Sequence, residues 1–215
     1  IEHRAPFLHK VGQWNKFSEF SGGTLVEKCC HYFDLFNVCA GPNNPVVKVY
    51  ASGGKAVNFK DFAYQGKSSD ILDHAFVVVD YRNGMRACLN ICMFSYGKGS
   101  SEEMLINGSD GRIRAVDIPQ QQLNVWRKGS HPSLECSVEF PSEIATTGNH
   151  GGSTWLEHEL FYRAIKGEAV DIPTALDGFW AVVVGSAAEQ SVKTGQPVYI
   201  DSFLKEAGVP NTSSC

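Results

Sequence analysis

The sequence has 215 residues, which is long enough for one large domain with a buried core. Hydrophobic residues make up 43% of the chain and charged residues 20%, as in ordinary soluble globular proteins. The formal net charge of -4, with no run of lysine or arginine, argues against a nucleic acid partner. We expect no membrane partner, because no apolar run is long enough for a transmembrane helix and the N-terminal residues lack a signal-peptide core. The first residue is not methionine, so we expect translation to begin upstream of it.

The seven cysteines are an odd number and form no Cys-x-x-Cys pair. Reduced thiols that pack as small hydrophobic residues are typical of intracellular proteins, so we expect a cytoplasmic location. Two glycosylation sequons, Asn107-Gly108-Ser109 and Asn211-Thr212-Ser213, keep a secreted origin open as the alternative. The first of them is also typical of a turn between strands.

The expected elements follow one another along the chain. An irregular opening over residues 2–15 leads to a helix over 23–39, which glycine and proline end at 41–45. Alternating apolar residues and turn signals then predict strands at 46–52, 74–81, 85–94, 104–106, 112–118, 122–126 and 134–140. The hairpin signal between the second and third strands is Arg82-Asn83-Gly84, since Asn-Gly suits positive φ angles. Helical periodicity returns at 153–166 and at 174–194, and the second of these helices closes at Gly195.

Strands enclosed by helices at both ends indicate the α+β class, with an open, mainly antiparallel sheet that helices cover on one face. We expect residues 1–215 to form a single domain. In the strand over 85–94 the odd-numbered residues are all apolar, and the opposite face is mixed instead of fully charged. We therefore expect a homo-oligomer in which a second copy covers this face of the sheet; a mixed surface exposed to solvent is the alternative.

Three ionisable residues fall at helical spacing within the helix over 23–39. Glu27, His31 and Asp34 share an arc of roughly 60°. Apolar residues occupy most of the remaining circumference, which predicts a helix that is buried on nearly all sides and carries these three side chains into the interior. His31 suits general acid/base catalysis because a histidine ordinarily titrates near neutral pH, and the carboxylates could orient its ring. The alternatives are a buried polar network that only fixes helix packing and a metal site on the three side chains.

Other polar residues could bind a polyol substrate. His150 precedes Gly151-Gly152 at the start of the helix over 153–166, and a glycine-rich helix start can bind oxygen ligands through its backbone N–H groups. Lys10 and Asn15 are candidates from the opening segment, with a surface or packing role as the alternative for each. The run Gly97-Lys98-Gly99 lacks the third glycine of a dinucleotide fingerprint and leads into a strand, so we predict no cofactor-binding residue in this chain.

Several motifs carry a family resemblance. The run from Gly22 to Leu35, Gly-Gly-Thr-Leu-Val-Glu-Lys-Cys-Cys-His-Tyr-Phe-Asp-Leu, resembles the Gly-Gly and Asp/Glu-x-x-x-His-x-x-Asp segment of the Gfo/Idh/MocA oxidoreductases, which include inositol 2-dehydrogenases. His150-Gly151-Gly152 and the helix after it resemble the late His-Gly-Gly helix of that family, and Thr194-Gly195-Gln196-Pro197-Val198 resembles its usual ending. The similarity covers nearly the whole chain.

The resemblance implies a C-terminal substrate-binding and oligomerisation domain, and it implies that the N-terminal Rossmann domain that holds NAD or NADP is absent from this chain. It places Glu27 and His31 where family members contact the reacting carbinol of a sugar or cyclic polyol such as inositol. Asp34 is expected in the substrate-binding site, where it supports the helix or the histidine. Glu27 stands where many members have aspartate. The family's catalytic lysine belongs to the missing domain, so we expect the chain alone to bind no dinucleotide tightly and to be inactive. The alternative is a stand-alone, non-catalytic protein for ligand binding or assembly, derived from the same domain.

Overall fold

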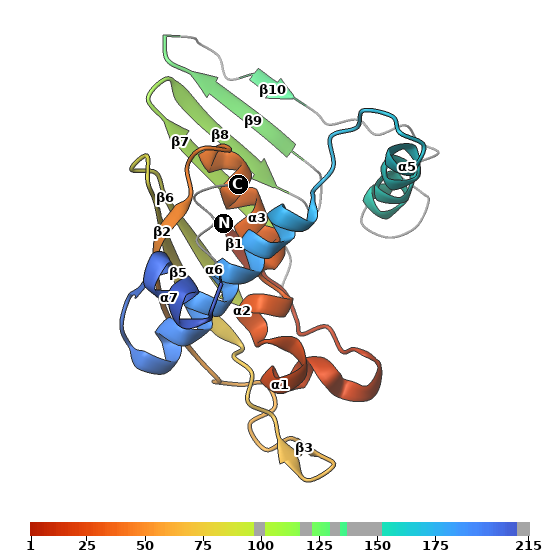
Figure 1. Ribbon diagram of the computed structural model, residues 1–215, viewed down its shortest axis with the longest axis vertical. Coiled ribbons are helices and arrows are strands. Elements are labelled where there is room, and N and C mark those ends of the chain that lie inside the picture. The colour runs from red at the N-terminus through yellow and green to blue at the C-terminus, as the bar shows by residue number, and fades with distance from the viewer. Residues whose placement is uncertain (97–101, 117–121, 130–133, 137–151, 210–215) are drawn as a thin grey trace.

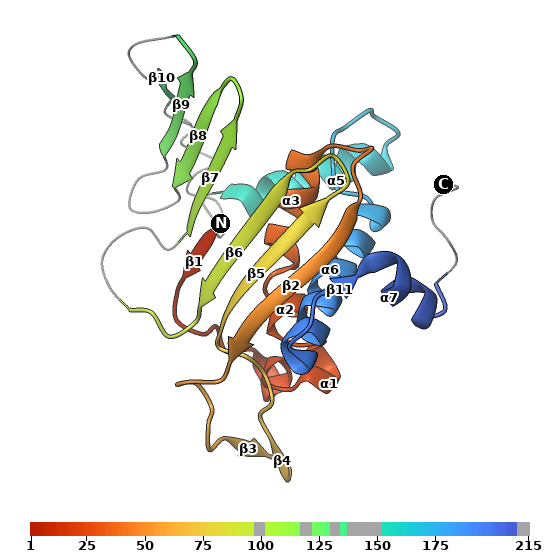
Figure 2. The same ribbon diagram turned by 90° about the vertical axis from the view of Figure 1, so that its left-hand side faces the viewer.

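The computed structural model describes residues 1–96, 102–116, 122–129, 134–136 and 152–209. Within these residues a nine-stranded sheet forms one layer, and helices lie against part of one of its faces (Figures 1 and 2). The strand order is β10-β9-β8-β7-β1-β6-β5-β2-β11. The pairing of β1 with β6 is parallel, and the other neighbouring strands are antiparallel. The predicted mainly antiparallel sheet with helices on one face is confirmed.

The strands of the large sheet are β1 (Glu2–Arg4), β2 (Val46–Gly54), β5 (His74–Tyr81), β6 (Arg86–Cys92), β7 (Glu102–Gly108), β8 (Gly111–Val116), β9 (Gln122–Arg127), β10 (Leu134–Cys136) and β11 (Val198–Tyr199). A separate small hairpin consists of β3 (Ala63–Tyr64) and β4 (Lys67–Ser68). The helices are the 3-10 helix η1 (Val11–Lys16), α1 (Ser18–Ser21), α2 (Thr24–Glu27), α3 (Cys30–Ala40), α5 (Ser153–Ile165), α6 (Ala175–Thr194) and α7 (Ile200–Glu206). No helix among the described residues is both long and apolar enough to span a membrane.

Local sequence signals place several elements correctly. Strand β5 has the predicted bounds, and β5 and β6 pair across the predicted hairpin turn. Helix α6 begins behind Thr174, whose hydroxyl accepts a hydrogen bond from the Asp177 N–H in a capping box, and ends at Gly195 in the left-handed conformation. Residues 117–118 and 137–140 of two predicted strands lie outside the described residues.

The prediction of an irregular opening over residues 2–15 is wrong. Three of these residues form β1, which lies in the middle of the sheet, and a pattern this short has no readable period. The 3-10 helix η1 follows, and it contains two residues with left-handed backbone angles, Gly12 at φ 69° and Gln13 at φ 61°. Local periodicity predicts neither element. Strand β1 forms because it pairs with strands that are distant in the sequence, and a left-handed turn interrupts the 3-10 helix η1.

The prediction of one helix over 23–39, buried on nearly all sides, is also wrong. Lys28 and Cys29 separate α2 from α3, although both keep right-handed helical backbone angles. One side of α3 packs on the core, where Phe33 is completely buried. The other side is open to solvent, because Leu35 is 41% and Val38 is 70% exposed. The apolar composition of this helix therefore predicts more buried surface than the structure shows.

The core lies between the central strands and helices α3 and α6 (Figure 2). The inward residues of β2, β5 and β6 alternate with exposed ones, and Val49, Val77 and Leu89 are completely buried. Side chains of β7 and β8 are half-buried or exposed, so the helices cover only the part of the sheet from β6 to β2. Helix α6 packs against strand β2 and also contacts the helices α2 and α3.

A close backbone contact joins α6 to the start of α2. A Cβ atom at Gly185 would lie 2.5 Å from the carbonyl oxygen of Leu25 and 3.1 Å from the Val26 Cα. Only glycine can occupy this position without displacing the backbone of α2. By contrast, Gly178 near the start of the same helix has open space around it.

We predict opposite effects for two Gly→Ala substitutions within α6. Gly185→Ala will lower the free energy of unfolding by about 1–3 kcal/mol, because the methyl group overpacks a rigid contact. Gly178→Ala will raise it by up to about 1 kcal/mol through helix propensity alone. Urea denaturation of both variants tests this, and a Gly185→Ala protein at least as stable as the unaltered chain would contradict the contact.

A buried polar cluster ties α3 to the sheet at β1 and β7. The Tyr32 hydroxyl lies 2.7 Å from His3 Nδ1 and donates a hydrogen bond of 2.5 Å to Glu102 Oε1. His3 Nδ1 is itself 2.9 Å from Glu102 Oε1. His3 and Tyr32 are almost fully buried, at 4% and 5% exposed. Hydrogen bonds from His3 and Tyr32 lower the pKa of Glu102 from 4.5 to about 2, against the opposing effect of burial.

This cluster predicts a specific acid sensitivity. The pKa of Glu102 is lower in the folded chain than in the unfolded chain, so the Glu102 carboxylate stabilises the fold above about pH 4.5, and the contribution is lost as the pH falls toward 2. Glu102→Gln should therefore flatten the dependence of the free energy of unfolding on pH between about pH 5 and pH 3. Urea denaturation across this range measures the effect, and the exposed Glu206→Gln is the control. Identical pH dependence of Glu102→Gln and the unaltered chain would refute it.

Candidate functional site

The Gly-Gly turn before α2 determines where the site begins. Gly22 and Gly23 have φ angles of +78° and +102°, which glycine adopts readily and other residues rarely do. A Cβ atom at Gly23 would lie 2.3 Å from Glu189 Oε1 of α6. The turn therefore changes the direction of the chain between α1 and α2 and places the Gly23 backbone directly against the Glu189 side chain.

Glu189 is the residue of α6 that contacts this turn. Its side chain is buried, with the residue 8% exposed, and its Oε1 accepts a hydrogen bond of 2.9 Å from the Leu25 N–H. Burial raises the pKa of the Glu189 carboxyl, and the hydrogen bond from Leu25 opposes that shift. A second link runs from Thr24, whose hydroxyl donates a hydrogen bond of 2.5 Å to the Leu72 carbonyl before β5. The first turn of α2 is thus fixed to both α6 and the sheet.

The helix pair presents its ionisable side chains at the surface. His31 is exposed, and Glu27 and Asp34 on either side of it are half-buried. Within the described residues, no side-chain hydrogen bond or ion pair engages these three side chains. The prediction that α2 and α3 carry them into the interior is wrong, because the core-facing positions are those of Leu25, Cys29 and Phe33.

Asp34 lies near two other ionisable groups, Asp177 and His31. Burial and the nearby charge of Asp177 raise the pKa of its carboxyl, and His31 lowers it. The Asp34 carboxyl therefore interacts electrostatically with both the His31 ring and Asp177 at the start of α6. An imidazole between two carboxyl groups can exchange a proton with a ligand hydroxyl while a carboxylate stabilises the imidazolium form.

The other predicted site residues have different positions. Asn15 in η1 is 5% exposed and donates a hydrogen bond of 2.9 Å from Nδ2 to the Leu8 carbonyl, while its buried Oδ1 has no partner within the described structure. Lys10 is half-buried just before η1. Among described residues, no hydrogen bond links Lys10 or Asn15 with Glu27 or His31. His150 lies outside the described residues.

Sequence reasoning missed the residues that support the site. In the sequence, Glu189 is a single charged residue within an alanine-rich helix, and nothing marks it as the partner of Leu25. The cluster of His3, Tyr32 and Glu102 joins residues that are 29 and 70 positions apart in the chain. No local pattern marks such partners. Tyr32 is adjacent to His31 but points to a different side of α3, so the same helical turn supplies a buried structural tyrosine and an exposed histidine.

The described residues offer little to a metal or a dinucleotide. No group of three or more His, Cys, Asp or Glu side chains in the described ranges could hold a metal ion, which counts against a metal site on Glu27, His31 and Asp34. The strands and helices of this part of the chain also include no glycine-rich turn from a strand into a helix of the kind that binds dinucleotides. The run at 97–99 lies outside the described residues.

Comparison with solved structures identifies the fold. An oxidoreductase from Agrobacterium radiobacter, in complex with NAD+, L-tartaric acid and magnesium, matches with a TM-score of 0.67 and 16% identity over 94% of this chain and 56% of that chain. The WlbA dehydrogenase from Bordetella pertussis, in complex with NADH and UDP-GlcNAcA, matches with a TM-score of 0.59 and 16% identity over 91% and 52% of the two chains. Aldose-aldose oxidoreductase from Caulobacter crescentus, complexed with glycerol, matches with a TM-score of 0.65 and 13% identity over 92% and 53%.

These matches share one feature: this chain spans just over half the length of each of the three proteins. No curated protein sequence matches the chain. A family model described as the C-terminal alpha/beta domain of an oxidoreductase family, GFO_IDH_MocA_C, matches residues 1–200. The chain therefore belongs to the Gfo/Idh/MocA oxidoreductase family and corresponds to its C-terminal α/β domain.

Proposed function

We propose that this chain is the substrate-binding domain of an NAD(P)-dependent oxidoreductase that acts on a CH–OH group of a sugar or a cyclic polyol such as inositol. The observation that carries the proposal is the exposed His31 ring near the half-buried Asp34 carboxyl, with the half-buried Glu27 four residues before it, on a helix pair fixed to the core. Three similar structures support the substrate class, since they hold L-tartaric acid, UDP-GlcNAcA and glycerol, which all carry hydroxyl groups.

The proposed residues divide the chemistry between them. Oxidation of a carbinol removes a hydride from carbon and a proton from oxygen, and a bound nicotinamide supplies the hydride acceptor. The neutral His31 ring takes the hydroxyl proton as a general base. The Asp34 carboxylate stabilises the resulting imidazolium, and Glu27 accepts a hydrogen bond from a neighbouring hydroxyl of the substrate. Lys10, Asn15 and His150 are proposed to contact more distant hydroxyl groups.

The dinucleotide is proposed to bind to a separate Rossmann domain, which in this family also contributes a lysine to the catalytic site. The 215-residue chain alone, mixed with NAD+ and inositol or simple sugars, should then produce no NADH. Turnover by the pure chain would overturn this part of the proposal.

The role of His31 is testable in the full-length enzyme that contains this domain. His31→Gln removes the proton acceptor and should lower kcat by about 10²–10⁴-fold, with loss of the limb of the pH profile that reports the base. His158→Gln is the matched control, because His158 is an exposed histidine of α5 whose Nδ1 lies 2.7 Å from the Thr154 carbonyl oxygen. NAD(P)H absorbance follows both. An unchanged kcat in His31→Gln would exclude the proposed base.

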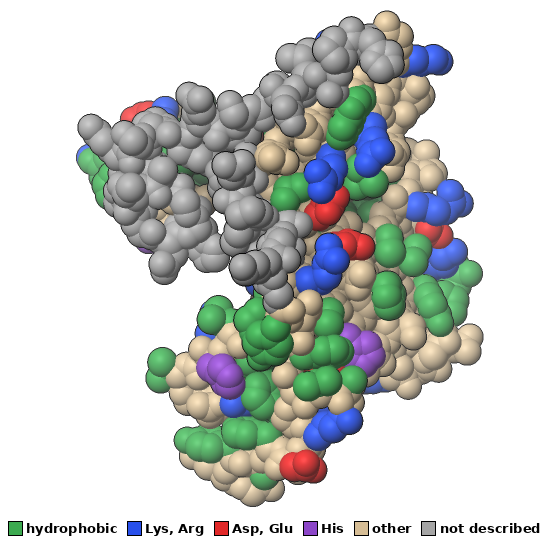
Figure 3. All heavy atoms as spheres, turned by 180° about the vertical axis from the view of Figure 1, so that it is seen from behind, with side chains coloured by type: hydrophobic (Ala, Val, Ile, Leu, Met, Phe, Trp, Pro, Cys, Tyr) green, Lys and Arg blue, Asp and Glu red, His purple; other side chains and the backbone are tan. Residues whose placement is uncertain are grey.

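The outer face of the sheet is proposed to join two copies of the chain. Tyr50 and Val78 are cross-strand partners on this face, and they are 42% and 39% exposed, next to Phe76 at 58%. Asp80 of β5 forms ion pairs with Lys48 of β2 and Arg86 of β6. Seen from behind, hydrophobic side chains lie among charged ones instead of forming a uniformly charged surface (Figure 3). Such a mixed, partly apolar face is typical of protein interfaces.

Substitution within this face tests the proposed oligomer. Phe76→Glu buries a carboxylate in the interface and should shift the chain toward monomer in analytical ultracentrifugation. Val57→Glu is the control, since Val57 is equally exposed, at 57%, but lies in the loop before β3. A chain that is monomeric without substitution, or a Phe76→Glu variant that remains associated, would refute this interface.

A further inference from the structure

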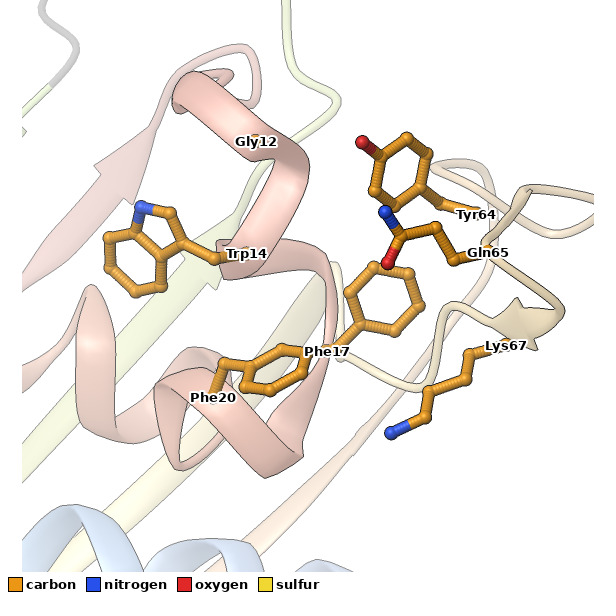
Figure 4. A pocket seen from close by; sticks show the side chains of 7 residues that line it. All are labelled: Gly12, Trp14, Phe17, Phe20, Tyr64, Gln65 and Lys67. Carbon is orange, nitrogen blue, oxygen red and sulfur yellow. The ribbon is translucent and has the colours of Figure 1, made fainter.

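A cavity that the candidate catalytic residues do not line lies near the start of the chain. It has a volume of about 450 Å³ and opens between η1 and α1 on one side and the β3–β4 hairpin on the other (Figure 4). Its lining includes Phe17, Phe20, Tyr64, Gln65 and Lys67, but not Glu27, His31 or Asp34. This volume falls within the range of small-molecule sites. The cavity is therefore a candidate binding site that the proposed reaction does not use.

Aromatic rings form the floor and two walls of the cavity. Phe17 is 5% exposed, whereas Phe20 and Tyr64 are 58% and 42% exposed. The Phe17 and Phe20 rings are 6.2 Å apart and nearly perpendicular, at 81°. In Figure 4 the Phe17 ring and the Gln65 amide are turned toward one another, and the indole of Trp14 points away from them. Exposed ring faces on either side of a cavity favour a ligand with an apolar face.

The rim of the cavity is polar but carries no unpaired charge. Lys67 is the charged residue of the lining, and its ammonium pairs with the Glu19 carboxylate and lies 5.4 Å from the centre of the Phe20 ring. The pair offers a donor and an acceptor without net charge, which disfavours an anionic ligand. The Gln65 amide and the Tyr64 hydroxyl add further donors and acceptors. A wholly apolar ligand would leave these groups desolvated without partners.

The two walls of the cavity are joined by direct contacts, so the cavity is preformed. The Ser18 N–H donates a hydrogen bond of 2.7 Å to Asp70, and the Ser69 hydroxyl donates one of 2.9 Å to the Lys16 carbonyl. The Lys16 ammonium lies 4.0 Å from the centre of the Phe62 ring, which joins η1 to the loop before the hairpin. Gln65 has a left-handed backbone conformation, with φ at 52°, in the turn at the tip of the hairpin.

We propose that this cavity binds a neutral sugar ring. The C–H face of the ring stacks on Phe20 and Tyr64, and its hydroxyl groups bond to Gln65 and to the Lys67–Glu19 pair. The combination of ring faces with uncharged donors and acceptors matches a pyranose better than a phosphate, a carboxylate or a hydrocarbon. Binding here needs neither a dinucleotide nor His31, so the inference stands apart from the proposed reaction.

Saturation-transfer NMR on the 215-residue chain tests the proposal. The probes are methyl α-D-glucopyranoside, galactopyranoside and mannopyranoside, compared with cyclohexanol and adenosine. We expect transfer to the C–H protons of at least one glycoside, with Kd on the order of millimolar for a ligand of this size. Tyr64→Ala and Phe20→Ala should each weaken binding by about tenfold. The control is Tyr162→Ala, because Tyr162 is also exposed, at 59%, but lies on α5 and does not line the cavity.

Several results would overturn the proposal. They are no transfer to any glycoside, tighter binding of adenosine or cyclohexanol than of the glycosides, and equal weakening by Tyr64→Ala and Tyr162→Ala. Binding that His31→Gln removes and Tyr64→Ala leaves intact would place the sugar at the candidate catalytic residues and also refute this site. Circular dichroism of each variant shows whether a loss of binding is a loss of fold, and the two aromatic variants must agree for the proposal to stand.

Discussion

The contact between α6 and the turn that starts α2 is the constraint on which the rest of this structure depends. Two glycines make it possible, since Gly23 lies against the Glu189 carboxylate and Gly185 lies against the Leu25 carbonyl. The Leu25 N–H then donates directly to Glu189. Because no Cβ atom separates the two segments, α2 cannot shift along α6 without losing a hydrogen bond to a buried carboxylate. Such a loss would be large, since the carboxylate would remain buried without its partner.

This constraint explains how one helix pair supplies both core and site. Leu25, Cys29 and Phe33 face the core with no exposed surface, and their positions set the rotation of α2 and α3 about the helix axis. At that rotation Glu27 and Asp34 become half-buried and His31 becomes exposed. The cluster of Tyr32 with His3 and Glu102 fixes the same rotation from the sheet side. The side chains proposed for acid/base chemistry thus stand on a rigid support, as catalytic positioning requires.

The sequence predicts the parts of the fold that short-range chemistry controls. The Asn83-Gly84 hairpin, the cap at Thr174 and the end of α6 at Gly195 all follow from local backbone preferences. The spacing of Glu27, His31 and Asp34 and the glycine pair before them lead to the correct family. The resemblance to the family rests on this segment together with His150-Gly151-Gly152 and the run from Thr194 to Val198.

What the sequence could not supply depends on tertiary contacts. Strand β1 exists because it lies between β6 and β7, and three residues carry no pattern of their own. The sequence predicts burial for the exposed side of α3 because residues such as Leu35 are apolar, and composition cannot reveal that no part of the described chain covers this side chain. The aromatic cavity is assembled from segments about fifty residues apart, such as Phe17 and Tyr64, which meet only after the hairpin folds back.

Amide hydrogen exchange at Leu25 tests the central constraint most directly. An N–H in the first turn of a helix has no partner within that helix, and it ordinarily exchanges fast. If the Leu25 N–H is held by the buried Glu189, it should exchange only when the whole domain unfolds, at a free energy of opening similar to that of the Val77 N–H in the central strand β5. Exchange at Leu25 that is orders of magnitude faster than at Val77 would show that α2 moves freely on α6, and it would contradict a rigidly held site.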